Sequence, residues 1–306
     1  QATFTTRKVK LSDFPVKTTK VVMTGNEITD QYFREEVISR WRISPYEFCT
    51  LDEFNTLKSS TDYYFLMIVK GQNRKETEPG TNLITLIKGG LPEKDAGIGD
   101  MYEVITIPFC PTSMSTGREF TYLPALMDLM QDMVSDAIEH GSTTFVAMKK
   151  NTWKPDKSKT VVISEDDLAA SALPLKFRNF GGRLKIVSEA EADSTFSSGA
   201  PLTLVSYVVA PQDPQKGSVS YDMLFDAETH VVNGVSLAVF FCQMLDLQHT
   251  HTSFLNNLYS LTLISFSLSL SRLLLSLLFL PSLQAFQILL IRKSVLDPVG
   301  IGPLPL

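Results

Sequence analysis

The sequence is short of the residue types on which most site chemistry depends. Of 306 residues, only three are cysteine and four are histidine. The three cysteines (Cys49, Cys110 and Cys242) form no C-x-x-C pair, which argues against a disulfide framework and against a cysteine-based metal site. Cys49 and Cys110 each lie in an apolar run, so we expect two small buried side chains, with a single disulfide between them left open.

The motifs that mark common cofactors and catalytic groups are lacking as well. The chain contains no G-x-G-x-x-G, no phosphate-binding G-x-x-x-x-G-K, no H-E-x-x-H and no G-x-S-x-G. His140 ends a predicted helix, where its ring suits the helix dipole, and His230 has no ligand-type neighbour at metal spacing. We therefore expect neither a metal nor a cofactor, and we lean toward a protein that is not an enzyme.

Charge is scarce in the last quarter of the chain. The formal net charge is −5, but after Asn233 only five side chains are charged: Asp246, Arg272, Arg292, Lys293 and Asp297. The preceding part is mildly acidic and has no basic stripe, so we predict that it does not bind nucleic acid. This shift predicts two regions, a mixed α/β domain over residues 1–232 and a hydrophobic Leu/Ser-rich tail over residues 233–306.

Three explanations compete for the tail. Residues 273–291 are uncharged and long enough to span a bilayer, although Pro281 interrupts them. The Leu/Ser alternation before them is also what a pyrimidine-rich repeat yields when translated out of frame. We favour a frameshift product over a membrane anchor, and a helical hairpin comes third. The strand predicted at Ser218–Phe225 then ends the domain without a partner strand to follow it.

The first part of the domain reads as strands alternating with helices. Strands are predicted at Lys20–Thr24, Phe48–Thr50 and Tyr63–Val69, with helices between them capped by Thr29 and opened by Asp52. This β-α-β-α-β order implies parallel strands covered by helices. Two further strands follow over residues 82–87 and 102–108. The fold class is therefore α/β, with helices packed on a mixed sheet.

A long amphipathic helix is predicted over Tyr122–His140. Thr121 is its expected cap, and Pro124 falls in the expected first turn. Three aspartates four residues apart, Asp128, Asp132 and Asp136, oppose its apolar stripe; we interpret them as a solvated face rather than a metal site.

The end of the domain reads as strands joined by turns. Strands at Leu184–Val187, Leu202–Val209 and Ser218–Phe225 predict an antiparallel extension, and no internal repeat is evident. Ser164 and Asp167 form an acidic capping box, so the acids at 165–167 are assigned to the amino end of their own short helix.

Two loops between a strand and a helix are the candidate binding positions, because ligands of α/β sheets gather there. The first contains Thr24, Gly25 and Asn26. The second runs from Pro111 to Arg118, with Ser115, Thr116, Gly117 and Arg118 as candidate ligand-binding residues, suited to an anion at a helix amino end. A capped, hydrogen-bonded turn is the competing interpretation of the second loop, and we favour it.

Two segments carry a resemblance to a group of known proteins. The run KVVMTGNEITDQYFREEVISRWRISPYEFCTLDEFNTLKSSTDYYFLMIVKG, together with STGREFTYLPALMDLMQDM, resembles uncharacterised exported proteins of Bacteroidota over residues 1–230. The resemblance implies export to the periplasm or cell exterior, with a signal peptide removed before Gln1, and it brings no catalytic residues.

These observations lead to three functional hypotheses. The first is a non-enzymatic exported protein that binds an unidentified protein or small molecule, or assembles at the envelope. The second is a hydrolase or transferase with its site at the Pro111–Arg118 loop. A cleft that holds Arg118 with converging acids or with Cys110 would favour this second hypothesis. The third is a protein anchored in a membrane through its tail.

Overall fold

The structure is a computed structural model of the chain. It describes residues 9–73, 76–90, 101–113, 116–144, 156, 158–167, 182–214 and 218–239, with side chains described as far as Val232. The chain divides into the units Gln1–Asn256 and Asn257–Leu306, and every described residue belongs to the first. The predicted tail beyond residue 239, including residues 273–291, lies outside the described residues.

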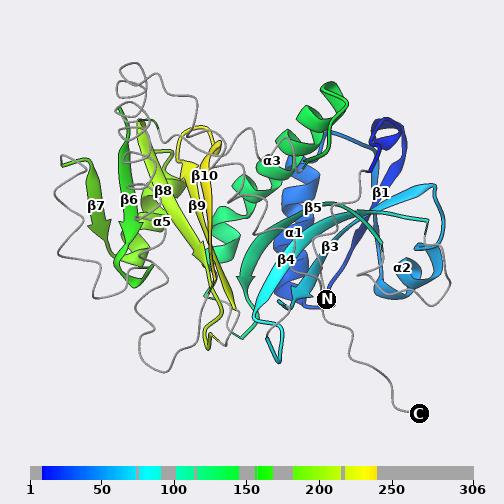
Figure 1. Cartoon of the computed structure of the whole chain (residues 1–306), viewed down its shortest axis with the longest axis horizontal. Coiled ribbons are helices and arrows are strands. Elements are labelled where there is room, and N and C mark those ends of the chain that lie inside the picture. The colour runs from blue at the N-terminus through cyan, green and yellow to red at the C-terminus, as the bar shows by residue number, and fades with distance from the viewer. Residues whose placement is uncertain are drawn as a thin grey trace, which may run out of the picture. The chain divides into compact units, whose positions relative to one another are not determined.

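Five strands form the first sheet. They are β1 (Thr18–Val22), β2 (Tyr46–Cys49), β3 (Tyr63–Gly71), β4 (Thr81–Lys88) and β5 (Tyr102–Pro111), in the order β2-β1-β3-β4-β5 (Figure 1). β1 pairs in parallel with β2 and β3, whereas β3, β4 and β5 pair antiparallel. The predicted parallel β-α-β-α-β unit is confirmed, with the apolar β3 at the centre of the sheet.

Two helices cover opposite faces of this sheet. Phe33 and Val37 of α1 (Glu27–Arg40) join one apolar cluster, and Phe54 of α2 (Leu51–Leu57) joins another on the other face. Both helices begin earlier than predicted. Asn26, not Thr29, caps α1, and its side chain accepts a hydrogen bond from the Thr29 amide at 3.0 Å. Thr50 caps α2 in a capping box with Glu53, two residues ahead of the expected start at Asp52.

A second sheet repeats the first. Its strands are β6 (Thr160–Ser164), β7 (Leu184–Val187), β8 (Thr203–Val209), β9 (Val219–Asp226) and β10 (Val232–Val239), in the order β7-β6-β8-β9-β10. β6 pairs in parallel with β7 and β8, and the last three strands pair antiparallel. Strand order and strand directions match those of the first sheet one by one.

The topological duplication corrects three predictions. An internal repeat is present, although no sequence period marks it. The segment before β8 is not a plain turn but contains α5 (Glu189–Ser197), which turn-like Ser residues and only two buried apolar side chains, Ala192 and Phe196, made hard to recognise. β9 does have a partner strand, since Val232–Val239 pairs with it along its length. The sheet therefore continues past the predicted boundary at Val232.

The helix α3 (Arg118–Glu139) connects the two sheets. It packs on α1 and β5 of the first sheet and on α5 of the second (Figure 1). It begins four residues before the predicted start, because Gly117 takes the left-handed φ of +85° at its cap. Thr121 and Pro124 therefore lie inside the helix. Its predicted apolar stripe is buried, in a single apolar cluster that contains side chains from both sheets.

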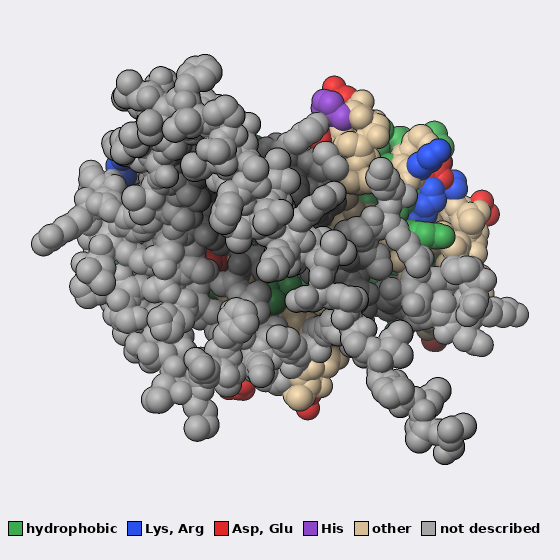
Figure 2. All heavy atoms as spheres, in the orientation of Figure 1, with side chains coloured by type: hydrophobic (Ala, Val, Ile, Leu, Met, Phe, Trp, Pro, Cys, Tyr) green, Lys and Arg blue, Asp and Glu red, His purple; other side chains and the backbone are tan. Residues whose placement is uncertain are grey.

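The acidic side of α3 is partly paired. Asp132 is exposed, as predicted, but Asp128 accepts a hydrogen bond from Arg40 Nη1 at 2.8 Å and lies 3.3 Å from His230 Nδ1. On the face drawn in Figure 2, described basic side chains lie next to acidic and apolar ones at one end of the molecule. In the parts of the chain that the structure describes, no helix is long and apolar enough to cross a bilayer.

Candidate functional site

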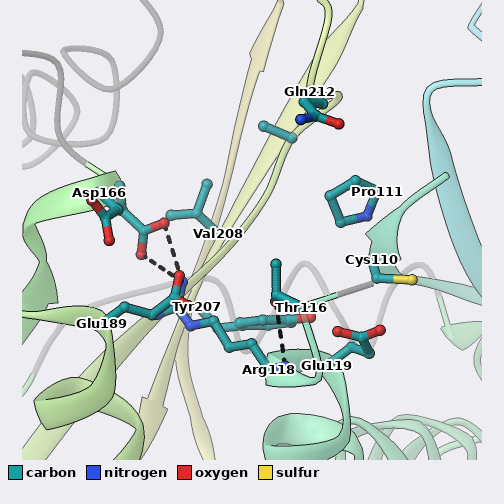
Figure 3. Close-up of a pocket in the computed structure, with 12 residues that line it drawn as sticks. Cys110, Pro111, Thr116, Arg118, Glu119, Asp166, Glu189, Tyr207, Val208 and Gln212 are labelled. Atoms are coloured by element: carbon teal, nitrogen blue, oxygen red, sulfur yellow. Dashed lines mark hydrogen bonds and ion pairs between the residues drawn. The ribbon is translucent and has the colours of Figure 1, made fainter. Parts of the chain in front are cut away.

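A pocket that combines charged side chains with a largely apolar wall lies at the carboxyl edge of the second sheet. Its volume is about 380 Å³, and Figure 3 shows its lining residues: Cys110, Pro111, Thr116, Arg118, Glu119, Asp166, Asp167, Glu189, Tyr207, Val208, Ala210 and Gln212. Asp166 and Asp167 follow β6 in the short 3-10 helix η3 (Glu165–Asp167), Glu189 follows β7, and Ala210 follows β8. Because β6 is flanked by β7 and β8, this edge is where the chain reverses its direction across the sheet. Ligands of α/β folds bind at such a position.

Arg118, the first residue of α3, is the cation of this pocket. Its side chain is only 7% exposed and is held by three acids. Its Nε donates to Asp193 Oδ1 at 2.9 Å, its Nη1 donates to both oxygens of Asp167 at 3.1 and 3.2 Å, and Glu189 Oε2 lies 3.7 Å away. A buried guanidinium with these partners is a fixed part of the wall.

Aromatic rings complete the setting of Arg118. Its guanidinium carbon lies 5.6 Å from the ring centres of both Tyr122 and Tyr207, and those two rings stack 4.3 Å apart. The Tyr207 hydroxyl donates a hydrogen bond to the Phe109 carbonyl of β5. The cation is thus held by electrostatic attraction to ring faces as well as by carboxylates, and these contacts also tie the second sheet to the first.

Two buried carboxyl groups interact at this edge of the sheet, Asp167 in the pocket lining and Asp222 on β9. Burial raises the pKa of Asp167 to about 6, although Arg118 opposes the shift. Burial, with the nearby Asp167 charge, raises the pKa of Asp222 on β9 to about 7. Ser220 Oγ lies 3.3 Å from Asp222 Oδ1, whereas Asp222 Oδ2 is buried with no hydrogen-bond partner. Asp222 is therefore the least satisfied acid of this edge.

Cys110 and Cys49 are both buried free thiols, so the predicted small buried side chains are confirmed. Burial raises the pKa of Cys110 to about 11, and Asn82 Nδ2 donates to its sulfur at 3.3 Å. The Cys110 thiol is consequently neutral near pH 7. A neutral thiol is a poor nucleophile, since the thiolate is the reactive form.

The two predicted loops differ in what they contribute. In the first, Thr24 donates to Asp30 Oδ1 from its amide and its hydroxyl, both at 2.7 Å, and the Gly25 amide donates to Asp30 Oδ2 at 2.9 Å. Asn26 caps α1, as described above. The loop is thus a hydrogen-bonded turn completed by its own helix. Its polar backbone groups are taken up by the chain itself.

The second predicted loop does reach the pocket. Thr116 and Arg118 line it, Gly117 caps α3, and Ser115 lies outside the described residues. The acids opposite Arg118 were missed as site residues. Asp167 was interpreted as a capping acid of its own short helix. Asp193 lies in a helix that was not predicted. The only available signal was Arg118 itself, a cation next to a helix amino end, where the helix dipole disfavours positive charge.

Comparisons bring no further identification. Protein-family models, curated proteins and solved structures were all compared with the chain, and none matched. Among the residues that the structure describes, no three histidine, cysteine, aspartate or glutamate side chains gather in a way that could hold a metal ion.

Proposed function

We propose that the chain is a non-enzymatic binding protein whose pocket takes a small organic cation, such as a primary amine. One observation carries the proposal. Among the lining residues that the structure describes, the acids Asp166, Asp167 and Glu189 outnumber one base, Arg118, which Asp167 and Asp193 already neutralise. The uncompensated charge is negative, so an added cation is attracted and an added anion is repelled.

The rest of the lining suits the apolar part of such a ligand. Pro111, Val208 and Ala210 contribute aliphatic surface, and Tyr207 contributes a ring. Binding sites for small molecules usually combine an apolar wall with a few placed polar groups. A cationic ligand also takes the place of the anion that was the less favoured interpretation of the Pro111–Arg118 loop, because the only described cation there is already paired. Export, which the family resemblance implies, remains our prediction for its location.

Calorimetric titration with n-butylamine and with butyrate tests the proposal. We expect heat of binding with the amine and none with the carboxylate. Glu189→Gln removes a partly exposed acid of the wall and should weaken amine binding about two- to fivefold, as expected for a pair worth about 0.5–1 kcal/mol. Glu191→Gln, an exposed acid two residues along α5 that does not line the pocket, is the matched control. Equal binding of amine and carboxylate, or no amine binding, would contradict the proposal.

A second function has a specific observation in its favour. The pocket brings Arg118, converging acids and Cys110 together, which is the arrangement that favours the hydrolase or transferase hypothesis. We consider the enzyme hypothesis the weaker of the two because the Cys110 thiol is neutral. Alkylation with iodoacetamide at pH 7.5 measures this directly. Slow alkylation, rising toward pH 11, supports the binding protein, whereas fast alkylation at pH 7.5 supports an enzyme with Cys110 as nucleophile.

A further inference from the structure

A second, smaller pocket adjoins the first. Its volume is about 100 Å³, and residues of the β3–β4 connection, of the end of β5 and of the β8–β9 connection line it: Glu76, Glu78, Pro79, Gly80, Thr112, Ser113, Pro211, Gln212, Asp213 and Ser218. Gln212 lines both pockets, so they are neighbours. Through the duplication, these two connections are counterparts in the two sheets.

Glu76 presents a buried, unpartnered oxygen to this second pocket. The residue is 7% exposed. Its Oε2 accepts hydrogen bonds from the Asn73 amide at 2.6 Å and from Asn73 Nδ2 at 3.1 Å, whereas its Oε1 is buried without a partner. A buried acceptor that lacks a donor destabilises the folded chain, which makes this oxygen a specific place for a ligand's donor.

The space beside this oxygen depends on Gly80. A β-carbon at that position would lie 3.2 Å from Glu76 Oε1 and 2.7 Å from Pro211 Cγ. Any other residue at position 80 would therefore crowd the oxygen and the proline ring. The absence of a side chain at Gly80 therefore allows Glu76 Oε1 and the Pro211 ring to lie close together at the wall of the pocket.

Acidic side chains line both pockets. Glu76, Glu78 and Asp213 line the second one, and none of the lining residues that the structure describes is basic. The rings of Pro79 and Pro211 give it apolar walls. Among the described residues no set of metal-ligating side chains converges, so a cation that brings its own hydrogen-bond donors fits better than a metal ion. An ammonium group has three such donors.

We propose that the ligand is a linear diamine or polyamine that occupies both pockets. One ammonium group lies among Asp166, Asp167 and Glu189, and the other donates to Glu76 Oε1. The methylene chain between them passes Gln212 along the apolar walls of the two pockets. This inference rests on the proposed function of the larger pocket and adds the second charged end and the linear shape of the ligand.

Titration with a graded series of ligands tests it on the full chain. The probes are n-butylamine, α,ω-diamines of three to eight carbons, and spermidine. Linking two sites raises affinity only when the linker spans them, so we expect one or two diamine lengths to bind at least about tenfold more tightly than butylamine. Glu76→Gln should abolish this advantage and leave the affinity for butylamine unchanged.

The outcomes separate the two proposals. Equal affinity for butylamine and for every diamine overturns the two-pocket ligand while the amine-binding function stands. The same holds if Glu76→Gln retains the preference for diamines. No binding of any amine overturns both. If Glu76→Gln does not fold, as judged by its thermal unfolding against Glu191→Gln, the length series on the unaltered chain still decides.

Discussion

The carboxyl edges of the two sheets have the same topology, but the first forms a closed turn and the second forms a pocket. After β1, the turn at Thr24–Asn26 binds the carboxylate of Asp30, six residues along the same segment. After β6, the carboxylate of Asp167 is held instead by Arg118, 49 residues away on α3. At the first edge the polar groups form hydrogen bonds within one short segment, and the result is a closed turn. At the second edge the carboxylate pairs with a cation from a distant segment, and the result is the wall of a pocket. Topology alone does not make a site.

The largest expected effect is at the distant ion pair. Arg118→Met leaves Asp167 and Asp193 without their cation in a buried setting, and we expect a loss of about 3–5 kcal/mol in the free energy of unfolding. The loss should be smaller at pH 5, where Asp167, with its pKa near 6, takes up a proton. Urea unfolding at both pH values measures it.

The control for that variant is Arg40→Met. Arg40 also bridges two acids, Glu36 and Asp128, but it is 32% exposed. We expect it to cost about 1 kcal/mol or less. Similar losses for the two arginine variants would remove the distinction between the pocket wall and an ordinary surface pair.

The next largest effect concerns Asp222, the buried acid at the second edge. The pKa of Asp222 is raised to about 7, so between pH 4 and 7 the folded state holds a proton that the unfolded state has lost. Its contribution therefore lowers stability as pH rises through this window. Asp222→Asn should match the unaltered chain near pH 4 and be more stable at pH 8, on the order of 1–3 kcal/mol.

The quantity to compare is the difference in unfolding free energy between Asp222→Asn and the unaltered chain at each pH. Asp13 and Asp226, whose pKa values are lowered by Lys17, Lys88 and Lys159 against the effect of burial, contribute stability that is lost as pH falls. Their effect is common to the variant and the unaltered chain and cancels in the difference. A stability difference that does not grow from pH 4 to pH 8 would show that Asp222 is ionised without penalty.

The smallest effect belongs to the first edge. Asp30→Ala removes the acceptor of the Thr24 and Gly25 amides, and loss of such a capping interaction costs about 1 kcal/mol. Thermal unfolding measures the cost. Amine binding at the larger pocket should be unchanged. A clear change in amine affinity would show that the first edge is a ligand site after all.

The local elements of this protein follow from patterns within single segments of the chain. The apolar run of β3 predicts a central strand, and the stripe of α3 predicts a buried helix, because both depend on patterns within one segment. The parallel start of the first sheet followed from the alternation of strands and helices. The starts of α1, α2 and α3 were displaced by a few residues, since Asn26, Thr50 and Gly117 compete as caps with equally suitable neighbours.

The duplication and the pocket depend instead on contacts between segments that lie far apart in the chain. The strand order of the second sheet depends on pairing between segments that no short-range pattern connects, and α5 has few apolar residues to reveal it. The partners of Arg118, at positions 167 and 193, meet it because the second sheet packs on α3. A charged side chain carries no record in sequence of which distant opposite charge will neutralise it. Its pairing with Asp167 and Asp193 leaves Arg118 already neutralised, whichever interpretation of the Pro111–Arg118 loop the sequence favours.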